Sequence, residues 1–492
     1  APGDTATPER VGLSVSIKGV GDGDQILLDD GRIEATVTDV DGEEVTAEIA
    51  NGGKLQSRKG VNIPGVDLDI NLITPGDKQE LKLAADKEAD FVAASFVRDG
   101  EDVYAIADKL EELGADIPVV AKIERAGAVE NLDSIISAAD GVMVARGDLG
   151  VECPLEDIPM IQKRIIKQCV DNGVPVITAT EMLDSMIGNR RPTRAEASDV
   201  ANAVLDGTDA VMLSGETAVG DHPVRVVETM ANIVSRVEST DEYAETVEQR
   251  VPAASDRSRT EPLARSARYL ARDIGAAAIV AASESGYTAR KAAKFRPPVP
   301  VVATTPNDRV RRQLALVWGV TPQYHQYEAD ADTILESSVQ AAISAGAAKS
   351  GETVVAISGL FSEVDGANTT NMLKVHIAAE KVASGKSVTG GRASGSLTRI
   401  TDGDLSTLPE GAILSLAADF DGEFTGDVTQ IAGIIDNGGG LTGYPAVVAR
   451  ELGIPMLSDA TVPDSIADGE TISIDAERGI VFDGDVLQST PR

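Results

Sequence analysis

The sequence predicts an α/β protein built around a partial (β/α)₈ barrel, and two observations carry that prediction. The first is the stretch 118–150, where two short runs rich in β-branched residues, 118–123 and 141–145, flank a segment whose apolar residues recur at helical spacing. Strand, helix and strand in this order form one parallel βαβ unit. The second is that five strand–helix units follow one another between residues 77 and 238, which is much of an eight-stranded barrel but not all of it.

Composition sets the class of protein. The 492 residues suffice for three or four domains, and the 42% apolar content is ample for their cores. The net charge of −35 is spread along the chain, which is typical of a solvated acidic surface in a salt-rich cytoplasm and argues against nucleic acid or an anionic membrane as partner. Cys153 and Cys169 fit no metal-binding spacing. Because neither a signal peptide nor an apolar stretch of about 18 residues is found, we expect a cytoplasmic protein.

Residues 1–65 are expected to form a β-rich module. The segments 26–40 and 43–53 alternate apolar and polar residues, and Asp41-Gly42 between them is a strong hairpin signal. Lys59 follows in a short basic stretch. From spacing alone, a solvent-exposed charge is the simpler explanation of Lys59.

Between residues 66 and 240, the predicted strands are 91–96, 119–123, 142–145, 176–179 and 210–213, with helices such as 102–113 and 158–170 among them. Small or polar residues end each of these strands: Ser95, Lys122 and Glu124, Arg146 and Asp148, Thr178 and Thr180, Ser214 and Glu216. The carboxyl ends of parallel strands meet on one edge of a sheet, where barrels keep their active sites. The convergence therefore predicts an active site there.

Two of these residues, Glu124 and Asp148, are carboxylates without a His or Cys beside them. Such a pair suits a hard cation such as Mg²⁺, and the nearby Lys122 suits a transferring phosphoryl group. Taken alone, the pair is more simply explained as two surface carboxylates, which are common in an acidic protein.

The remainder of the sequence is predicted to contain three further segments. Residues 241–262 are expected to be a linker, and 263–384 a second α/β unit in which the turn 283–288 precedes a basic helix. Hydroxyls and a Gly at a helix start suit a phosphate, although an ordinary cap and turn has the same composition. After a Gly/Ser-rich stretch, 384–395, residues 396–492 form a small domain with a Gly-rich loop that leads into a helix.

Three stretches, 26–65, 122–152 and 177–224, resemble the pyruvate kinase family, and the resemblance covers residues 10–384. It implies a TIM barrel with an inserted β lid domain, followed by an α/β regulatory domain. Residues 1–65 would be the remainder of the lid and 66–240 the barrel without its first three strands. Residues 396–492 resemble the swivelling β/β/α phosphohistidine domain of phosphoenolpyruvate synthases, with Tyr444 at the position of the phosphorylated His. A packing or regulatory role is therefore expected for this domain.

The resemblance implies transfer of phosphate from phosphoenolpyruvate to ADP in glycolysis, giving pyruvate and ATP. By resemblance, Lys122 stabilises the phosphoryl group in flight, and Glu124 and Asp148 hold Mg²⁺ or Mn²⁺. The other implied site residues are Ala145, Arg146 and Gly147, whose backbone amides would bind the substrate carboxylate; Thr180, beside the methylene carbon that gains a proton; Ser214 and Glu216, which would order the proton-delivering water; and Lys59, at a nucleotide phosphate.

The resemblance also implies regulation and assembly. Ser283, Ser285, Gly286 and Thr288 match a loop that holds a phosphate of a sugar-phosphate or nucleotide effector, and 359–376 match a loop that closes over it. The family is usually homotetrameric, and K⁺ is a further expected cofactor.

The resemblance begins inside the lid, so three barrel strands that carry substrate and K⁺ ligands in the family are lacking from the printed sequence. We expect the chain to be a fragment of a longer active enzyme, with little turnover and poor solubility alone.

Two other functions are compatible with parts of the pattern. Paired Glu and Asp with a cation also serve a metal-dependent pyruvate-enolate aldolase or lyase. A non-catalytic effector-binding or assembly protein is the third hypothesis. An assay for ATP formation against one for carbon–carbon cleavage separates the first two, and titration with metal and phosphoenolpyruvate tests the third.

Overall fold

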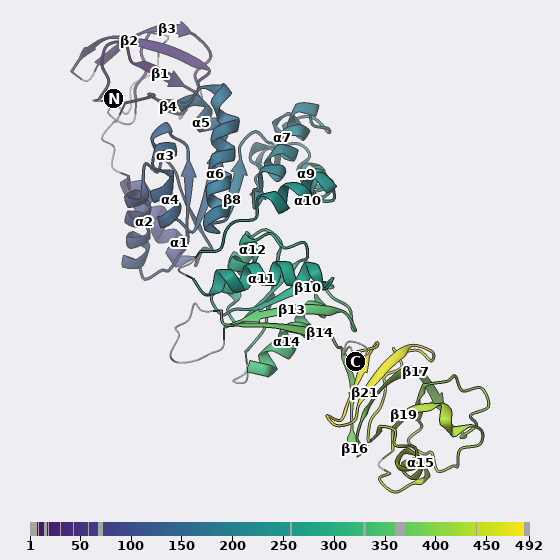
Figure 1. Cartoon of the computed structure of the whole chain (residues 1–492). Helices are drawn as coiled ribbons and strands as arrows, with labels where there is room; N and C mark the ends of the chain where they lie inside the picture. Colours follow the sequence, from purple (N-terminus) through teal and green to yellow (C-terminus); the bar gives the residue numbers. More distant parts are fainter. Residues whose placement is uncertain are drawn as a thin grey trace. The chain divides into compact units, whose positions relative to one another are not determined.

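The computed structural model describes residues 7, 9–13, 17, 19–29, 31–42, 44–57, 59–66, 72–255, 258–327, 331–359, 370–438 and 440–486. Contacts divide the chain into two units, Ala1–Ala253 with Leu316–Trp318, and Ala254–Ala315 with Gly319–Arg492. Within the described residues, the strands form four sheets (Figure 1). None of the described helices is long and apolar enough to cross a bilayer.

The first sheet is antiparallel, with strand order β3-β2-β1-β4. Its strands are β1 (Gln25–Leu28), β2 (Ile33–Asp41), β3 (Glu44–Asn51) and β4 (Val61–Asn62). The predicted hairpin is confirmed, because β2 and β3 pair across a turn with Gly42 at φ +64°. The prediction of one strand over 26–40 is wrong. A turn in which Asp29 and Gly31 have φ of +53° and +77° separates β1 from β2, since Asp and Gly both tolerate this backbone region.

The second sheet is parallel and carries the predicted strand ends. Its strands lie in chain order: β5 (Val92–Ala94), β6 (Val119–Ile123), β7 (Gly141–Ala145), β8 (Val176–Ala179) and β9 (Ala210–Val211). All five predicted strands are confirmed, with β5 and β9 shorter than expected. Every residue of β7 is buried, as parallel strands covered on both faces require.

The helices around this sheet are α1 (Pro75–Asp86), α2 (Gly100–Glu112), α3 (Ala126–Glu130), α4 (Leu132–Ala138), α5 (Arg146–Glu152), α6 (Ile158–Asn172), α7 (Arg194–Asp206), α8 (Gly215–Ala218), α9 (Pro223–Glu238) and α10 (Asp241–Gln249). The helical segment predicted between the strands 118–123 and 141–145 is divided into α3 and α4 at Asn131, whose side chain donates to the carbonyl of Arg98 at 3.1 Å. Helix α10 occupies part of the segment expected to be a linker and is capped by Thr240. Fully buried Leu132, Ile135 and Ile165 of α4 and α6 belong to the core of this sheet.

The third sheet has strand order β12-β11-β10-β13-β14, and only β14 is antiparallel to its neighbour. Its elements are α11 (Thr260–Asp273), β10 (Ala278–Ala282), α12 (Tyr287–Lys294), β11 (Val301–Thr305), α13 (Asp308–Leu314), β12 (Val320–Tyr324), α14 (Ala331–Ser344), β13 (Thr353–Ser358) and β14 (Met372–Ile377). The predicted second α/β unit therefore has the expected alternation of strand and helix.

The fourth sheet has eight strands in the order β15-β22-β21-β17-β18-β19-β20-β16. They are β15 (Lys381–Ser384), β16 (Lys386–Thr389), β17 (Arg392–Ile400), β18 (Ala412–Leu416), β19 (Ile431–Asp436), β20 (Met456–Ser458), β21 (Thr471–Asp475) and β22 (Ile480–Asp483), and α15 (Tyr444–Leu452) joins β19 to β20. The Gly/Ser-rich stretch 384–395 is thus not an irregular connection, because it contains β16 and the start of β17.

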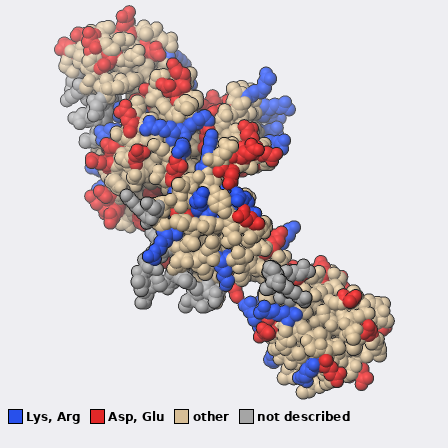
Figure 2. All heavy atoms as spheres, in the orientation of Figure 1, with Lys and Arg blue, Asp and Glu red and all other residues tan. Residues whose placement is uncertain are grey.

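Acidic side chains are distributed over the surface, as composition predicts. Figure 2 shows Asp and Glu on the N-terminal antiparallel sheet, on the parallel-sheet region and on the C-terminal domain, with Lys and Arg among them. The negative charge is therefore not confined to one patch of this face.

A buried ion cluster joins α11 to α12. Glu261 is 4% exposed, and its two carboxylate oxygens lie 3.0 Å from Lys291 Nζ and 2.9 Å from Lys294 Nζ. The backbone amide of Ser255 also donates to Glu261, at 2.8 Å. Burial by itself raises the pKa of Glu261, but Lys294, the Ser255 amide and Lys291 together outweigh it and lower the pKa to about 2.

This cluster predicts a pH-dependent stability. Because the folded-state pKa of Glu261 lies below its unfolded value of about 4.3, its stabilisation is complete above that value and is lost as the pH falls towards about 2. We expect Glu261→Gln to lower the free energy of unfolding by roughly 3 kcal/mol at pH 7, since two lysines lose their partner.

Urea unfolding at pH 7 and pH 3 measures the effect. The deficit of Glu261→Gln should shrink at pH 3, whereas the exposed control Glu242→Gln should change little at either pH. A deficit of equal size at both pH values would contradict the ionic origin of the stabilisation.

Candidate active site

The carboxyl ends of β5 and β6 are joined by a buried carboxylate. Glu124 directly follows β6, and its side chain is 2% exposed. One carboxylate oxygen lies 2.5 Å from Nζ of Lys122, and the other accepts the backbone N–H of Phe96 at 2.7 Å. The Lys122 ammonium also donates to the hydroxyl of Ser95 at 2.9 Å. Three of the polar residues that the sequence predicts at strand ends are therefore in direct contact.

The backbone at Phe96 is held in an unfavourable conformation. Its φ is +57° although its aromatic ring is 53% exposed and gains little by burial. A bulky residue in this region costs of order 1–3 kcal/mol. The charge-assisted hydrogen bond from its amide to Glu124 offsets part of that cost.

Asp148 lies in the first turn of α5, directly after β7. Glu152 lies at the other end of the same helix, and its pKa is raised. Burial is the largest cause of the increase, the nearby Arg125 opposes it, and the negative charge of Asp148 adds to it. Arg125 Nε lies 4.0 Å from the Glu152 carboxylate. Negative charge therefore accumulates around α5, beyond the two carboxylates that the sequence singled out.

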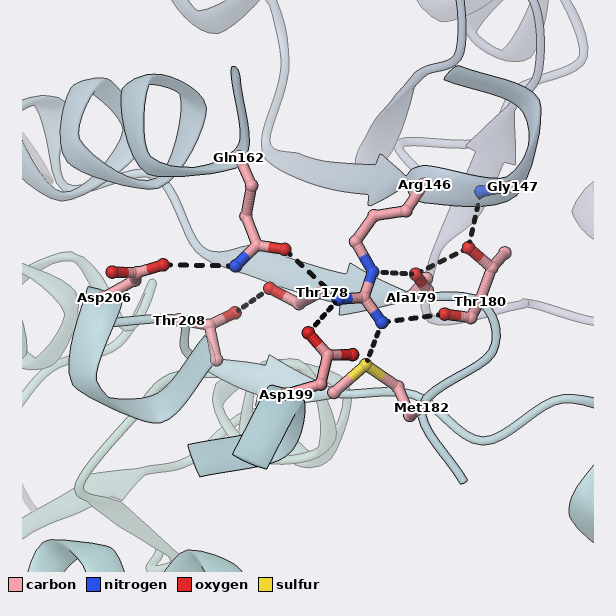
Figure 3. Close-up of polar contacts among 10 residues, drawn as sticks. All are labelled: Arg146, Gly147, Gln162, Thr178, Ala179, Thr180, Met182, Asp199, Asp206 and Thr208. Carbon is pink, nitrogen blue, oxygen red and sulfur yellow. Dashed lines mark hydrogen bonds and ion pairs between the residues drawn. The ribbon is translucent and has the colours of Figure 1, made fainter. Parts of the chain in front are cut away.

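The side chain of Arg146 points towards the loop after β8 (Figure 3). Its guanidinium donates to the carbonyls of Ala179 at 3.3 Å and Thr180 at 2.9 Å, and it pairs with Asp199 of α7 at 2.6 Å. It also contacts Met182 Sδ and, at 3.4 Å, the side-chain oxygen of Gln162 in α6. Arg146 is 13% exposed.

Thr180 connects β8 to the start of α5. Its hydroxyl accepts the backbone N–H of Gly147 at 2.8 Å and donates to the carbonyl of Ala179 at 2.7 Å. Thr180 and Glu181 both have left-handed backbones, with φ of +67° and +54°.

Glu216 ties the same loop to the end of β9. It is 1% exposed, and its two oxygens accept the amides of Leu183 at 3.1 Å and Ser214 at 2.7 Å. The loop after β8 is therefore held by Arg146 on one side and by Glu216 on the other. The structure thus brings the predicted residues together in two groups, one around Glu124 and one around Thr180.

The donor chemistry of Glu124 and Asp148 suits a divalent cation. Glu124 and Asp148 offer only oxygen ligands, and Mg²⁺ typically takes one or two protein carboxylates and completes its shell with water and substrate oxygens. Among the residues that the structure describes, no group of three or more His, Cys, Asp or Glu side chains is arranged to hold a metal ion.

Lys59 lies beside Asp29 in the antiparallel-sheet region, with its ammonium 2.6 Å from the carboxylate. Asp29 directly follows β1 and its side chain is 9% exposed. This region thus supplies a local partner for the Lys59 ammonium.

The predicted effector residues surround the start of α12. Gly286 has φ +74° and precedes the helix, and the amide of Thr288 donates to the hydroxyl of Ser283 at 3.3 Å. The Thr288 hydroxyl lies 2.7 Å from that of Thr370. Ser285 belongs to the same turn. Most of the predicted closing loop, residues 360–369, lies outside the described residues.

Sequence reasoning did not identify several residues that form this region. Phe96 contributes through its backbone, which no residue type signals. Asp199 and Gln162 reach Arg146 from 53 and 16 residues away, and both stand on helices where a polar residue is ordinarily on the exposed face.

Comparison with known proteins gives consistent matches along the chain. Residues 4–227 match the family model "Pyruvate kinase, barrel domain", 261–376 match "Pyruvate kinase, alpha/beta domain", and 408–479 match "PEP-utilising enzyme, mobile domain". A pyruvate kinase of Bacillus licheniformis and one of Geobacillus stearothermophilus are each 42% identical over 486 residues, which are 97% of this chain and 82% of the relative. A pyruvate kinase of Staphylococcus aureus (strain MRSA252) is 40% identical over 484 residues, with the same coverage.

Proposed function

The chain belongs to the pyruvate kinase family, and on that premise we propose that it transfers the phosphoryl group of phosphoenolpyruvate to ADP, giving pyruvate and ATP in glycolysis. Membership of this family makes it a kinase, and so a transferase. The observation that supports the reaction most directly is the Lys122 ammonium, 2.5 Å from the buried Glu124 carboxylate at the end of β6. A loose phosphoryl-transfer transition state requires positioned positive charge more than covalent help.

Lys122 is the proposed electrophilic group. A lysine is a compact point charge on a flexible stem, and this one is 24% exposed, so it can turn from Glu124 and Ser95 towards a phosphate. Glu124 then keeps the Phe96 amide as its partner. The lysine thus exchanges one charged partner for another, and the buried carboxylate keeps one hydrogen bond.

Glu124 and Asp148 are the proposed ligands of Mg²⁺ or Mn²⁺. When bound, the cation would supply charge stabilisation to the phosphate and to the enolate oxygen of the substrate. The chain's own part is to hold Glu124 rigidly through the Phe96 amide and to place Asp148 at the start of α5.

The substrate carboxylate is proposed to bind the backbone amides of Ala145, Arg146 and Gly147. The Gly147 amide donates to Thr180 in this structure, so carboxylate binding there requires the hydroxyl to release that bond. A hydroxyl released in this way is free to act on the methylene carbon, which gains a proton after phosphate leaves. Ser214 and Glu216 are the proposed residues that order the proton-delivering water.

The remaining roles concern nucleotide and effector. Lys59 is proposed to reach a nucleotide phosphate, for which it must leave Asp29. Ser283, Ser285, Gly286 and Thr288 are proposed to hold a phosphate of a sugar-phosphate or nucleotide effector, where hydroxyls and backbone amides converge at the start of α12. A homotetramer, dependence on K⁺, adaptation to salt and a cytoplasmic location stay predictions.

Lys122→Met tests the central role. We expect ATP formation from phosphoenolpyruvate to fall by about 10³-fold or more, because the transition state loses its positioned cation. Metal-dependent exchange of the pyruvate methyl protons in D₂O, followed by NMR, should be partly retained.

The matched control is Lys167→Met, which removes an exposed lysine of α6 that pairs only with Asp171 in an i,i+4 bridge. Equal loss of both partial reactions in Lys122→Met would contradict the proposed role. Carbon–carbon cleavage without ATP formation by the unaltered protein would favour a lyase instead.

Removal of the carboxylate charges tests the metal site. Glu124→Gln and Asp148→Asn should each weaken Mn²⁺ binding at least about tenfold, as measured by electron paramagnetic resonance of free Mn²⁺. Glu130→Gln, at the exposed end of α3, is the control and should leave the affinity unchanged. Unaltered affinity in both site variants would exclude this pair as ligands.

A charge placed in the turn 283–288 tests the effector site. Ser285→Asp should weaken binding of a sugar bisphosphate at least tenfold by calorimetry, because a carboxylate repels a phosphate. Ser285→Asn has nearly the same shape without the charge and should lose much less. Similar affinities in the two variants would contradict phosphate binding in this turn.

A further inference from the structure

The loop after β8 holds Thr180 in a backbone conformation that its own residue type disfavours. Thr180 and Glu181 have consecutive left-handed φ angles of +67° and +54°, and neither is a glycine. A β-branched residue in this region is a genuine outlier, so surrounding contacts must impose it.

The contacts that impose it come largely from Arg146. Its guanidinium donates to the carbonyls of Ala179 and Thr180, the two residues at the bend (Figure 3). The same group pairs with Asp199 at 2.6 Å, which fixes the guanidinium plane from the α7 side. Such charge-assisted bonds from a rigid fork specify direction as well as energy.

A second link holds the guanidinium from α6. Gln162 is 5% exposed, accepts from Arg146 at 3.4 Å and donates to Asp206 of α7 at 3.1 Å. Asp206 is paired in turn with Lys163. Arg146 therefore lies in a network that connects α6 and α7 to the bend after β8.

We propose that Arg146 is a positioning residue, whose side chain holds the loop after β8 so that the Thr180 hydroxyl faces the Gly147 amide and the reacting carbon beside it. Each of its three guanidinium nitrogens has a protein partner, so the side chain orients Thr180 and does not bind substrate. Glu216 completes the clamp through the Leu183 amide. The inference rests on the proposed role of Thr180 in proton transfer.

Arg146→Lys in the full-length protein is the test. Lysine keeps the charge but cannot contact Asp199 and both carbonyls at once. We expect exchange of the pyruvate methyl protons with D₂O, measured by NMR with ATP and Mg²⁺, to fall at least tenfold more than ATP formation from phosphoenolpyruvate. In that exchange a methyl proton leaves to solvent and a deuteron takes its place, with no other change in the substrate.

The matched control is Lys163→Met, which disrupts the same network at Asp206 without touching the loop. It should leave the ratio of the two rates within twofold of the wild type. An equal fall of both rates in Arg146→Lys would show a merely structural role and overturn the proposal, as would no change in either.

Hydrogen exchange followed by mass spectrometry supplies a readout that does not depend on activity. The segment 179–184 should lose at least tenfold protection in Arg146→Lys and keep it in Lys163→Met; unchanged protection overturns the proposal. Thr180→Val distinguishes failure of the proposed role of Thr180 from failure of the proposed role of Arg146. If that variant leaves methyl exchange unaltered while Arg146→Lys still loses protection, the proposed role of Thr180 fails and the clamp does not.

Discussion

The ion pair between Lys122 and the buried carboxylate of Glu124 is the interaction on which the rest of the site depends. A carboxylate that is 2% exposed is costly unless it is paired and hydrogen-bonded, and Glu124 has both a lysine and the Phe96 amide. The two partners differ in mobility, since an amide is fixed in the backbone and an ammonium lies on a flexible stem. When Lys122 turns to a substrate, Glu124 therefore keeps the fixed amide as its partner.

The same principle recurs at the other strand ends. At two places where the backbone leaves the sheet in a left-handed conformation, a largely buried charged side chain holds it: Glu124 at Phe96, and Arg146 at Thr180. Glu216 holds the same loop further along, at the amide of Leu183. Strained conformations persist only where surrounding contacts determine them. The charged groups at the ends of these strands thus have two effects. They create a local electric field that suits phosphate chemistry, and they fix the backbone so that its amides and the neighbouring hydroxyls face the site.

The sequence predicted the parts of this arrangement that local pattern controls. Runs of β-branched residues located all five strands of the parallel sheet, and the polar residues that end them located Glu124 and Arg146. Local pattern did not show the turn at Asp29. The alternation of apolar and polar residues continues across this turn, and alternation alone cannot distinguish one long strand from two short ones. Nor did it show that Arg146 binds Asp199, since a contact across 53 residues depends on how α7 packs.

In the C-terminal domain, an aromatic residue occupies the start of the helix that follows the Gly-rich loop. Tyr444 begins α15, and its ring meets Phe424 edge-on with centroids 5.7 Å apart. Below the Gly-rich loop, burial raises the pKa of the Asp436 carboxyl, although the amides of Gly438 and Gly440 donate to it and lower it in part. An anion brought to this loop would compete with that carboxyl for the same amides. The ring contact of Tyr444, together with loop amides that already donate to a carboxyl, supports the expected packing role of this domain over transfer of a phosphoryl group.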